Sequence, residues 1–570
     1  MRSVIQDGAK SIFNSLLRNK VKTAFMYGGG AIMPLTDQFQ GAIRAIVNNH
    51  EQNCGHAATG YAKSSGQPGV VIVTSGPGLT NMITPMMDAN KDGVPLVVFS
   101  GQVSLDAMGT DAFQECPAVG LSTHCTKWSY CAEKGDDLFE LSNEAFRVAM
   151  KDRKGAVHID LPRCLLVGPN GHSAKRFTDP RAPSQTADYE HLRTLIANSL
   201  SPVLCVGQGA NAYPRELAEF VERFDLHTTS TIHAMGTYNE RGRLSLGFMG
   251  MHGAPVANHA IQNADLIIAL GSRFDDRTTG QIDGYAPKCA HIIHVNIEKA
   301  ELGKVIDTSP SRLVHKLHMD CGVFLANMNR QRVVTTPRTI FGNKIEAWKT
   351  LHPLTYNTPA NDALNTQMVI EQINRSIEHD NTIIASGVGN HQMMAAQFIT
   401  WTQPNQFITS GSLGVMGVGL PYAIGAQLAN PDKVVVLIDG DGSFNHTLAD
   451  LQTMAKHKLP VKIFIMNDGH LSMVRVWEKL FYSGHHVTTS CSHNPDYNLL
   501  AASYGIRSIR ITNRSELQSM VEYAIRYDQG PILCNVMVES DICLPMVKPG
   551  RPLDDMMTIQ RYRGNIPSFC

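Results

Sequence analysis

The chain has 570 residues, enough for about three domains at roughly 100–200 residues each. Its 50 basic and 50 acidic residues cancel, so no long-range field would gather nucleic acid or an anionic membrane surface. A hydrophobic fraction of 43% excludes a disordered chain, and 47 glycines without a Gly-X-Y period exclude a collagen-like one. The composition is that of a globular protein whose partners bind at local sites.

The twelve cysteines are never closer than six residues apart, so the chain holds no C-x-x-C metal or redox pair. The first ten residues carry Arg2, Asp7 and Lys10 and do not resemble a signal or transit peptide. We therefore expect reduced thiols and a cytoplasmic location. The longest charge-free stretch, about 391–430, is too rich in Gly, Gln, Thr and Pro to span lipid, so no membrane association is expected.

Short apolar runs alternate with helical periodicity along the whole chain. They predict buried strands at 70–75, 95–100, 202–207, 266–271, 291–297, 434–439, 461–467 and 531–538. This βα alternation is typical of parallel sheets covered by helices. Polar stretches that contain proline, at 168–187 and 327–361, predict the domain boundaries. We predict three doubly wound α/β domains over 1–170, 188–330 and 362–550, followed by an irregular tail over 551–570.

A glycine turn in the third predicted domain carries a candidate metal ligand. Gly440-Asp441-Gly442 follows the strand at 434–439, and Asp468 follows the next strand, twenty-seven residues after Asp441. The carboxyl ends of parallel strands meet at one edge of a sheet, so the two carboxylates can hold a cation while the glycines admit a phosphate. Few protein oxygen ligands plus phosphate oxygens suit Mg²⁺. A turn without a ligand is the alternative for Gly-Asp-Gly taken alone.

This spacing resembles the diphosphate-binding motif of thiamine-diphosphate enzymes, which pair it with a glutamate in another α/β domain. The segment 48–81 holds Glu51 at a helix start, then a strand and the turn Gly76-Pro77-Gly78. A carboxyl group bonded to the aminopyrimidine favours the imino tautomer, which can take the proton from the thiazolium carbon. The resemblance implies that Glu51 is catalytic, and a first-turn residue that complements the helix dipole is the alternative.

Within these enzymes the chain resembles the acetohydroxyacid (acetolactate) synthase family over nearly its whole length. The matching motifs are GTDAFQE (109–115), GFMGMHG (247–253), GSRFDDRTTG (271–280), GVGNHQMMAAQF (387–398), SGSLGVMGVGLP (410–421), HLSMVRVWEKLFY (470–482) and LPMVKPG (544–550). The resemblance implies decarboxylation of pyruvate and transfer of the two-carbon unit to a second 2-keto acid. The product would be 2-acetolactate from pyruvate or 2-aceto-2-hydroxybutyrate from 2-ketobutyrate, in the first step of branched-chain amino-acid biosynthesis.

The resemblance also implies three cofactors, Mg²⁺, thiamine diphosphate and FAD. The metal would be held by Asp441, Asp468 and the carbonyl group of His470. The residues that match the thiamine-diphosphate site are Gly76, Val388, Gly389, Asn390, His391, Leu413, Gly414, Met416, Gly440, Gly442, Ser443 and Met473. Those that match the flavin site are Arg153, Gly207, Gln208, Gly209, Thr231, Ile232, Met249, Gly250, Met251, His252, Gly271, Ser272, Arg273, Phe274, Asp275, Asn296, Ile297, Glu301 and Asp320.

Catalytic and substrate positions follow from the same resemblance. The catalytic set is Glu51, Gly30, Phe113, Gln114 and Lys127, and the substrate set is Asp276, Arg277, Trp477 and Arg163. Arg277 would bind the carboxylate of the second 2-keto acid, Asp276 would orient Arg277, and the bulk of Trp477 would favour the longer acceptor. The alternatives are a structural salt-bridge cluster at 273–277, a core position for Trp477 and surface positions for Lys127 and Arg163.

Several positions depart from the family pattern. The turn Y-P-G-G-A reads Tyr27-Gly28-Gly29-Gly30-Ala31, and the flavin turn Gly-Gly-Gly is broken by Gln208. Asp468 stands where the family has asparagine, Asn390 where it has glutamine, and Ser472 where it has glycine. These changes bear on flavin affinity, metal demand and acceptor choice more than on reaction class.

The resemblance implies a homodimer, with thiamine diphosphate between the first domain of one subunit and the third domain of the other. A tetramer and a separate regulatory subunit are also consistent with the family. Two other functions stay open. One is another thiamine-diphosphate carboligase, oxidase or decarboxylase of this fold, and the other is a binding or assembly protein, against which the intact Glu51, Asp441 and Asp468 argue.

Overall fold

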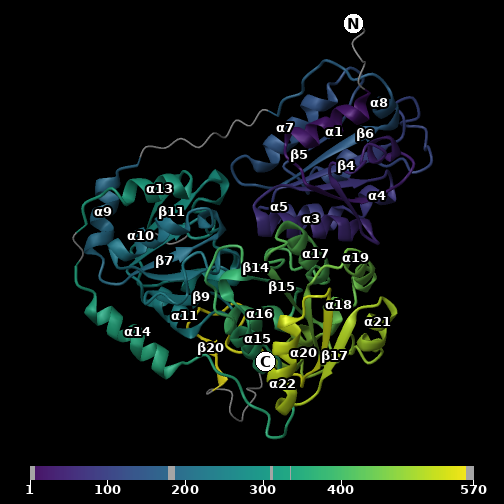
Figure 1. The fold of residues 1–570 in the computed structure, drawn as a ribbon. Coiled ribbons are helices and arrows are strands. Elements are labelled where there is room, and N and C mark those ends of the chain that lie inside the picture. The colour runs from purple at the N-terminus through teal and green to yellow at the C-terminus, as the bar shows by residue number, and fades with distance from the viewer. Residues whose placement is uncertain (1–6, 178–186, 308–311, 334–335, 560–570) are drawn as a thin grey trace.

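The computed structural model describes residues 7–177, 187–307, 312–333 and 336–559. Three six-stranded parallel sheets form three α/β domains, which are purple to blue, teal, and green to yellow in Figure 1. The strand orders along the chain are β2-β1-β3-β4-β6-β5, β12-β11-β10-β7-β8-β9 and β14-β13-β15-β16-β18-β17. The predicted fold class is confirmed, and each sheet lies within one of the predicted domain ranges.

The first domain contains β1 (Thr23–Tyr27), β2 (Arg44–Val47), β3 (Gly69–Val73), β4 (Leu96–Gln102), β5 (Trp128–Cys131) and β6 (Ala156–Pro162). Its helices are α1 (Gly8–Arg18), α2 (Met33–Thr36), α3 (Glu51–Ser65), α4 (Pro77–Thr80), α5 (Ile83–Lys91), α6 (Ala118–Ser122), α7 (Leu138–Met150) and α8 (Arg163–Val167). Successive residues of β3 enter two separate hydrophobic cores, Val70 and Ile72 on one face and Val71 and Val73 on the other. This burial on both faces explains the continuous apolar run.

The middle domain contains β7 (Pro202–Val206), β8 (His227–Ser230), β9 (Ser245–Phe248), β10 (Leu266–Leu270), β11 (His291–Asn296) and β12 (Leu313–His318). Its helices are α9 (Tyr189–Asn198), α10 (Pro214–Phe224), α11 (Pro255–Asn263), α12 (Asp276–Thr279) and α13 (Cys321–Met328). Helix α14 (Thr339–Leu351) follows, and Trp348 stacks on His259 of α11 with ring centroids 5.6 Å apart. The predicted boundary stretch 327–361 therefore contains a helix that packs on the middle domain.

The third domain contains β13 (Thr382–Ser386), β14 (Phe407–Ile408), β15 (Val434–Gly440), β16 (Lys462–Asn467), β17 (Arg507–Ile511) and β18 (Ile532–Met537). Its helices are α15 (Thr366–Ser376), α16 (Asn390–Phe398), α17 (Gly419–Ala429), α18 (Asp441–Phe444), α19 (Leu451–Lys456), α20 (Ser472–Phe481), α21 (Tyr497–Ser503) and α22 (Arg514–Arg526). All eight strands predicted from apolar runs are present, as β3, β4, β7, β10, β11, β15, β16 and β18.

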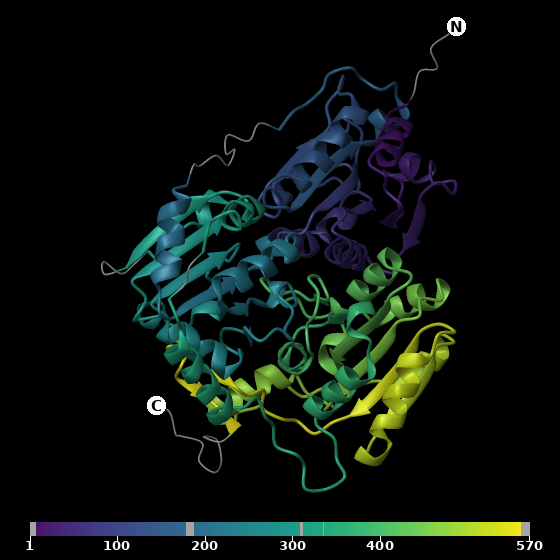
Figure 2. The ribbon, with the colours of Figure 1, turned by 60° about the vertical axis from the view of Figure 1, so that its left-hand side comes forward.

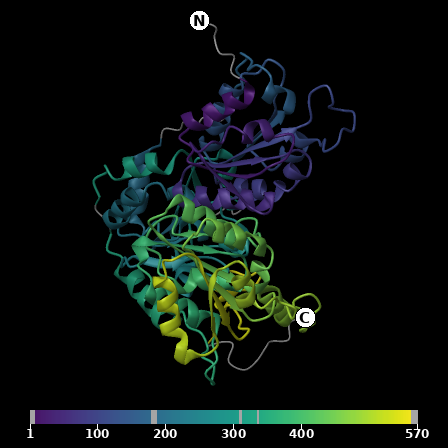
Figure 3. The same ribbon diagram turned by 45° about the vertical axis from the view of Figure 1, so that its right-hand side comes forward.

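The first and third domains share one hydrophobic core through α3 and α17, which lie against each other in Figure 3. Glycines allow the close approach of these helices. A Cβ atom at Gly60 would lie 2.4 Å from the carbonyl oxygen of Tyr422, and one at Gly425 would lie 1.9 Å from that of Ala57. Any larger residue at these two positions would push the domains apart.

The predicted irregular tail is wrong for residues 551–559. The chain leaves the third domain and pairs β19 (Met546–Val547) with β20 (Met556–Met557) in an antiparallel ladder. Leu553 and Met556 are buried in the core of the middle domain, and Figure 2 shows this yellow segment beside the teal helices. Burial of these two apolar side chains, too isolated to form a periodic pattern, fixes the tail on the middle domain. Within the described ranges, no helix has the length and apolar character that crossing a bilayer would require.

Candidate functional site

Two cavities adjoin each other, one between the domains and one inside the third domain. The larger has a volume of about 1390 Å³ and is lined by all three domains, and the smaller, of about 60 Å³, lies within the third domain. Both are lined by Val388, Gly389, Met473 and Val474, so these residues separate one cavity from the other. The larger volume exceeds the usual range of roughly 300–1,000 Å³ for small-molecule pockets and suits a long ligand such as a dinucleotide.

The smaller cavity contains the predicted metal ligands. Asp441 is the first residue of α18, directly after β15, and Asp468 follows β16, the strand paired with β15 in parallel. Both aspartates and His470 line the cavity. Strand pairing thus brings together two carboxylates that the sequence separates, as the motif spacing predicts.

The charges in this cavity fit a divalent cation. Burial, and then the charge of Asp468, raises the pKa of Asp441 to about 7, although Asn494 donates a hydrogen bond of 2.6 Å to the Asp441 carboxylate. A cation between the carboxylates would remove this repulsion. The described residues contain no cluster of three His, Cys, Asp or Glu side chains suited to a metal. Two carboxylates, with phosphate oxygens completing the coordination, fit Mg²⁺.

Two of the departures from the family pattern contact each other. The Ser472 hydroxyl donates to one oxygen of the Asp468 carboxylate, and Ser540 donates to the same oxygen at 2.7 Å. The backbone N–H of His470 donates to the other oxygen at 3.1 Å. Asp468, which stands where the family has asparagine, is thus stabilised by Ser472, which stands where the family has glycine.

Most of the predicted thiamine-diphosphate residues surround the same two cavities. Those lining the smaller one are Val388, Gly389, Asn390, His391, Met416, Gly440, Gly442, Ser443 and Met473, while Leu413 and Gly414 line the larger one. Asn390 Oδ1 is buried without a hydrogen-bond partner in the protein. An unpaired buried acceptor beside two carboxylates marks a position that a ligand or water would satisfy.

Fifteen of the nineteen predicted flavin residues line the larger cavity, and the exceptions are Gly207, Gly250, Phe274 and Glu301. Gly207 is needed for close packing of strand ends, because a Cβ atom there would lie 2.4 Å from the carbonyl oxygen of Gly271. Phe274 is buried between Tyr285 and His294. Glu301 forms an ion pair with Lys304. The predicted role of Phe274 as a cofactor contact is therefore corrected to a core position.

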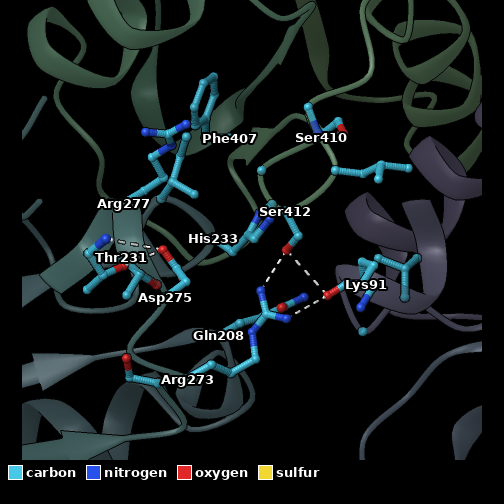
Figure 4. Close-up of a pocket in the computed structure, with 18 of the residues that line it drawn as sticks. Lys91, Gln208, Thr231, His233, Arg273, Asp275, Arg277, Phe407, Ser410 and Ser412 are labelled. Carbon is cyan, nitrogen blue, oxygen red and sulfur yellow. Dashed lines mark hydrogen bonds between the residues drawn. The ribbon is translucent and has the colours of Figure 1, made fainter. Parts of the chain in front are cut away.

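Two arginines converge on the Lys91 carbonyl group at the side of the larger cavity, and Figure 4 shows one of them, Arg273, beside Lys91 and Ser412. Arg153 donates to the Lys91 carbonyl oxygen at 2.7 Å, and Arg273 donates to the same oxygen at 3.1 Å and to Ser412 Oγ at 2.6 Å. Burial, and then the charge of Arg273, lowers the pKa of Arg153. Two guanidinium groups that share one carbonyl acceptor keep further N–H donors for a ligand, which fits a diphosphate group such as that of FAD.

The predicted substrate residues Asp276, Arg277 and Trp477 also line the larger cavity. Trp477 and Met473 both project from α20, and Arg277 donates to Met251 Sδ at 3.5 Å. Asp276 and Arg277 are 3.9 Å apart and more than half exposed. An ion pair this exposed stabilises the fold little, which argues against a purely structural role. An accessible guanidinium that shares a cavity with an aromatic side chain fits a small carboxylate with an apolar end.

The predicted catalytic residues of the first domain do not line either cavity. Glu51 is the first residue of α3 and is almost buried, and Asn81 donates to its Oε2 at 2.9 Å. Gly76 lies against Gln114, since a Cβ atom at Gly76 would be 3.1 Å from Gln114 Cα. Phe113 is 88% exposed. Within one chain these residues and the metal carboxylates therefore share neither of the two cavities.

Lys127 and Arg163 are not brought to the site. The Lys127 ammonium group donates to the carbonyl oxygens of Val148, Lys151 and Arg153 at 2.6–2.8 Å, which fixes the end of α7. Its predicted catalytic role is corrected to a structural one, because all three donors are engaged. Arg163 begins α8 on the surface and lines neither cavity. Gly30 is exposed, with open space around it.

The sequence reasoning missed a polar network beside the larger cavity. It consists of Lys63, Asp88, Asp92, His233 and Ser410, which join the three domains. The segment PMMDANKDGVP (85–95) could have indicated this network. Its two aspartates, Asp88 and Asp92, are four residues apart, the spacing of one helix face, and interrupt an apolar pattern. Buried carboxylates at such positions require partners.

Comparison with known proteins agrees with this geometry. Three family models match: the N-terminal TPP binding domain of thiamine pyrophosphate enzymes over residues 6–121, the central domain over 189–318 and the C-terminal TPP binding domain over 387–536. The acetolactate synthase catalytic subunit of Saccharomyces cerevisiae, a mitochondrial protein, is 39% identical over 96% of this chain and 83% of its own. The large subunit of acetolactate synthase isozyme 2 of Escherichia coli is 36% identical over 97% of this chain and 99% of its own. The chain therefore belongs to the acetolactate synthase family of thiamine pyrophosphate-dependent enzymes.

Proposed function

We propose that the chain decarboxylates pyruvate and joins the two-carbon unit to a second 2-keto acid, pyruvate or 2-ketobutyrate, as the first step of branched-chain amino-acid biosynthesis. The observation that carries this proposal is the junction of the two cavities. Asp441 and Asp468 fit a metal diphosphate on one side of Met473, and Arg277 and Trp477 fit an acceptor acid on the other side. A decarboxylase without an acceptor would not need the second group.

Thiamine diphosphate, when bound, supplies a nucleophilic carbon and an electron sink that accepts the electrons released with carbon dioxide. Asp441, Asp468 and the His470 carbonyl group would hold Mg²⁺ and so anchor the diphosphate, while Met416 would contact the cofactor beside the metal. Arg277 would bind the acceptor carboxylate and fix its keto carbon toward Met473. Trp477 would fill the space next to the acceptor side chain and set its preferred length.

Glu51 would reach this chemistry from a second copy of the chain. Neither cavity is lined by Glu51 or Gln114. Phe113 of the first domain and Val487 of the third are 88% and 86% exposed, and apolar side chains this exposed fit an interface with another subunit. We propose a homodimer, or a tetramer built from two such dimers, in which each site takes Glu51 from one subunit and Asp441 from the other. A separate regulatory subunit is compatible with the word "catalytic" in the yeast relative's name.

A complementation experiment tests the shared site. Glu51→Gln and Asp441→Ala are each expected to be nearly inactive alone. Co-expression should restore activity, because one of the two sites in every mixed dimer receives both wild-type residues. Purified mixed dimers that remain as inactive as their parents would show that each site takes both residues from a single chain.

FAD would occupy the larger cavity, with Arg153 and Arg273 near its diphosphate and Gly209 and Gly271 at its closest approach to the backbone. His252, also at this cavity, has a buried Nδ1 without a partner. We propose that the flavin is structural here. An oxidase of the same fold is the second candidate, because it would use the same cavity for a redox flavin. Anaerobic absorbance spectra during turnover with pyruvate separate the two, since only the oxidase would bleach the flavin.

The whole proposal is tested by the product. Purified protein with pyruvate, thiamine diphosphate, Mg²⁺ and FAD should form 2-acetolactate, identified by mass spectrometry. Acetaldehyde or acetate as the main product would contradict the proposal and support a decarboxylase or an oxidase. A cytoplasmic location is proposed from the eleven described cysteines, all of which are free. Fractionation of the source cells tests the location.

A further inference from the structure

A buried polar network outside the predicted site joins the three domains beside the larger cavity. Asp88 in α5 and Asp92 directly after it are at most 1% exposed and come from the first domain. They contact residues 410–412 of the third domain, and His233 of the middle domain lies 3.1 Å from Asp92. In Figure 4, His233, Ser410 and Ser412 lie around this junction. Two carboxylates buried so completely must be compensated by partners.

Asp88 is linked to residues 414 and 415 through the Ser410 hydroxyl group. Ser410 donates to the Asp88 carboxylate at 2.5 Å, and its oxygen accepts the backbone N–H groups of Gly414 and Val415 at 3.1 and 3.0 Å. The donated proton leaves the Ser410 oxygen free to accept both N–H groups. The chain from 410 to 415 is therefore closed into a turn whose orientation depends on where Asp88 lies.

The Asp92 carboxylate binds the main chain of the same segment. Its carboxylate accepts the backbone N–H groups of Ser412 at 2.9 Å and Gly411 at 3.3 Å. Burial alone would raise the pKa of Asp92, but His233 at 3.1 Å and Lys63 at 2.6 Å hold it well below its ordinary value. Lys63 also donates to the Thr409 carbonyl oxygen at 2.7 Å. The carboxylate is thus charged and able to accept from the segment.

Other hydrogen bonds also hold this segment: Arg273 donates to Ser412 Oγ at 2.6 Å, and Gln392 donates to the Ser410 carbonyl oxygen at 3.2 Å. Side-chain packing adds little. Gly411, Ser412, Leu413 and Gly414 are exposed, and Leu413 retains 42% of its surface. Gly414 has a φ of +73° with open space around its Cα, so packing does not restrict it. Hydrogen bonds, those to the two aspartates among them, therefore supply much of the order that side-chain packing supplies elsewhere.

We propose that Asp88 and Asp92 are positioning residues that set the geometry of the cofactor-facing segment 410–416 of the third domain. Asp88 acts through the Ser410 hydroxyl group and Asp92 through the backbone N–H groups of Gly411 and Ser412. The inference rests on the proposed function, since it takes Leu413, Gly414 and Met416 as contacts of thiamine diphosphate. It assigns to the first domain a second task, distinct from the task of Glu51.

Two matched substitutions test the inference, because Tyr422 donates its hydroxyl to the other oxygen of Asp88 from α17. Ser410→Ala and Tyr422→Phe each remove one hydroxyl donor from the same carboxylate, but only Ser410 is linked to Gly414 and Val415. We expect Ser410→Ala to raise the KM for thiamine diphosphate about tenfold at saturating Mg²⁺. Tyr422→Phe should leave that KM within about twofold, while both substitutions lower the melting temperature by similar amounts.

Hydrogen exchange of the apo protein provides a second readout. In Ser410→Ala the peptide that spans residues 409–416 should exchange faster than in wild type, and in Tyr422→Phe it should not. Equal KM values and equal exchange in the two variants would overturn the inference and leave Asp88 a purely structural residue. If Ser410→Ala fails to fold while Tyr422→Phe folds, hydrogen exchange is measured on Asp92→Asn instead. The peptide 409–416 should again exchange faster than in wild type. Wild-type protein that bound no thiamine diphosphate would instead overturn the proposed function, and this inference with it.

Discussion

Replacing Glu51 by glutamine tests the catalytic assignment with little change to the fold. The structure shows Glu51 Oε2 accepting a hydrogen bond from Asn81 at 2.9 Å, and an amide oxygen can accept the same bond. In the glutamine, an NH₂ group replaces the other carboxylate oxygen, Oε1. This NH₂ group donates hydrogen bonds but cannot exchange a proton with a pyrimidine nitrogen. Folding and cofactor binding should therefore survive, and proton transfer should not.

The expected magnitude follows from the two functions of the group. The retained Asn81 bond limits the stability loss to about 1 kcal/mol. General acid–base contributions are about 10²–10⁴-fold, or about 2.7–5.4 kcal/mol of transition-state stabilisation at 1.36 kcal/mol per tenfold. The catalytic effect should therefore exceed the effect on stability by a clear margin.

The assay measures acetolactate formation from pyruvate and deuterium exchange at the thiazolium carbon in parallel. Glu190→Gln is the matched control, because Glu190 is also an acidic residue in the first turn of its helix, α9, where it can act only on the helix dipole. Glu51→Gln should slow both processes about 10²-fold or more, while Glu190→Gln should slow neither. Wild-type rates in Glu51→Gln would reduce Glu51 to a first-turn residue and refute the reasoning.

Asp441→Ala should abolish activity through loss of the metal, whereas Asp468→Asn should stay active with a changed Mg²⁺ requirement in titrations of the rate; an inactive Asp468→Asn would contradict the assigned ligands. Arg277→Lys should weaken carboligation with every acceptor while decarboxylation of the first pyruvate survives. Trp477→Leu should lower the ratio of acetohydroxybutyrate to acetolactate by about tenfold in competition experiments, and an unchanged ratio would place Trp477 in the core. Burial against the Trp401 segment raises the pKa of Glu240 to about 8, above its unfolded value, so its contribution to stability is lost as pH rises through 8. The melting temperature of Glu240→Gln should therefore rise relative to that of wild type between pH 5.5 and pH 9, and a constant difference between the two proteins would exclude a titrating Glu240.

The strands predictable from sequence are those buried on both faces. The run 434–439 was recognisable as β15 because its apolar residues are buried almost without interruption, which leaves a continuous signal. Edge strands carry no such signal, and β17 (Arg507–Ile511) holds two arginines. The ordered tail was missed for a similar reason, since Leu553 and Met556 pack on the middle domain as single residues without periodicity.

The site was predictable where motif spacing reflects strand pairing. Asp441 and Asp468 meet because β15 and β16 are neighbours, which the spacing already indicates. Lys127 was misplaced because a lysine that binds three carbonyl groups of its own domain looks the same in sequence as one in a substrate channel. Asp88 and Ser410 are 322 residues apart, and no local pattern links them. Contacts of that kind require the tertiary structure.

The ratio of carbon dioxide released to pyruvate consumed distinguishes carboligation from decarboxylation without an acceptor. Carboligation of pyruvate with pyruvate releases one carbon dioxide for every two pyruvates consumed, and the account predicts this ratio together with an equal amount of 2-acetolactate. Purified protein with thiamine diphosphate, Mg²⁺ and FAD, assayed under anaerobic conditions, suffices for the measurement. One carbon dioxide for every pyruvate, with no acetolactate, would contradict the account.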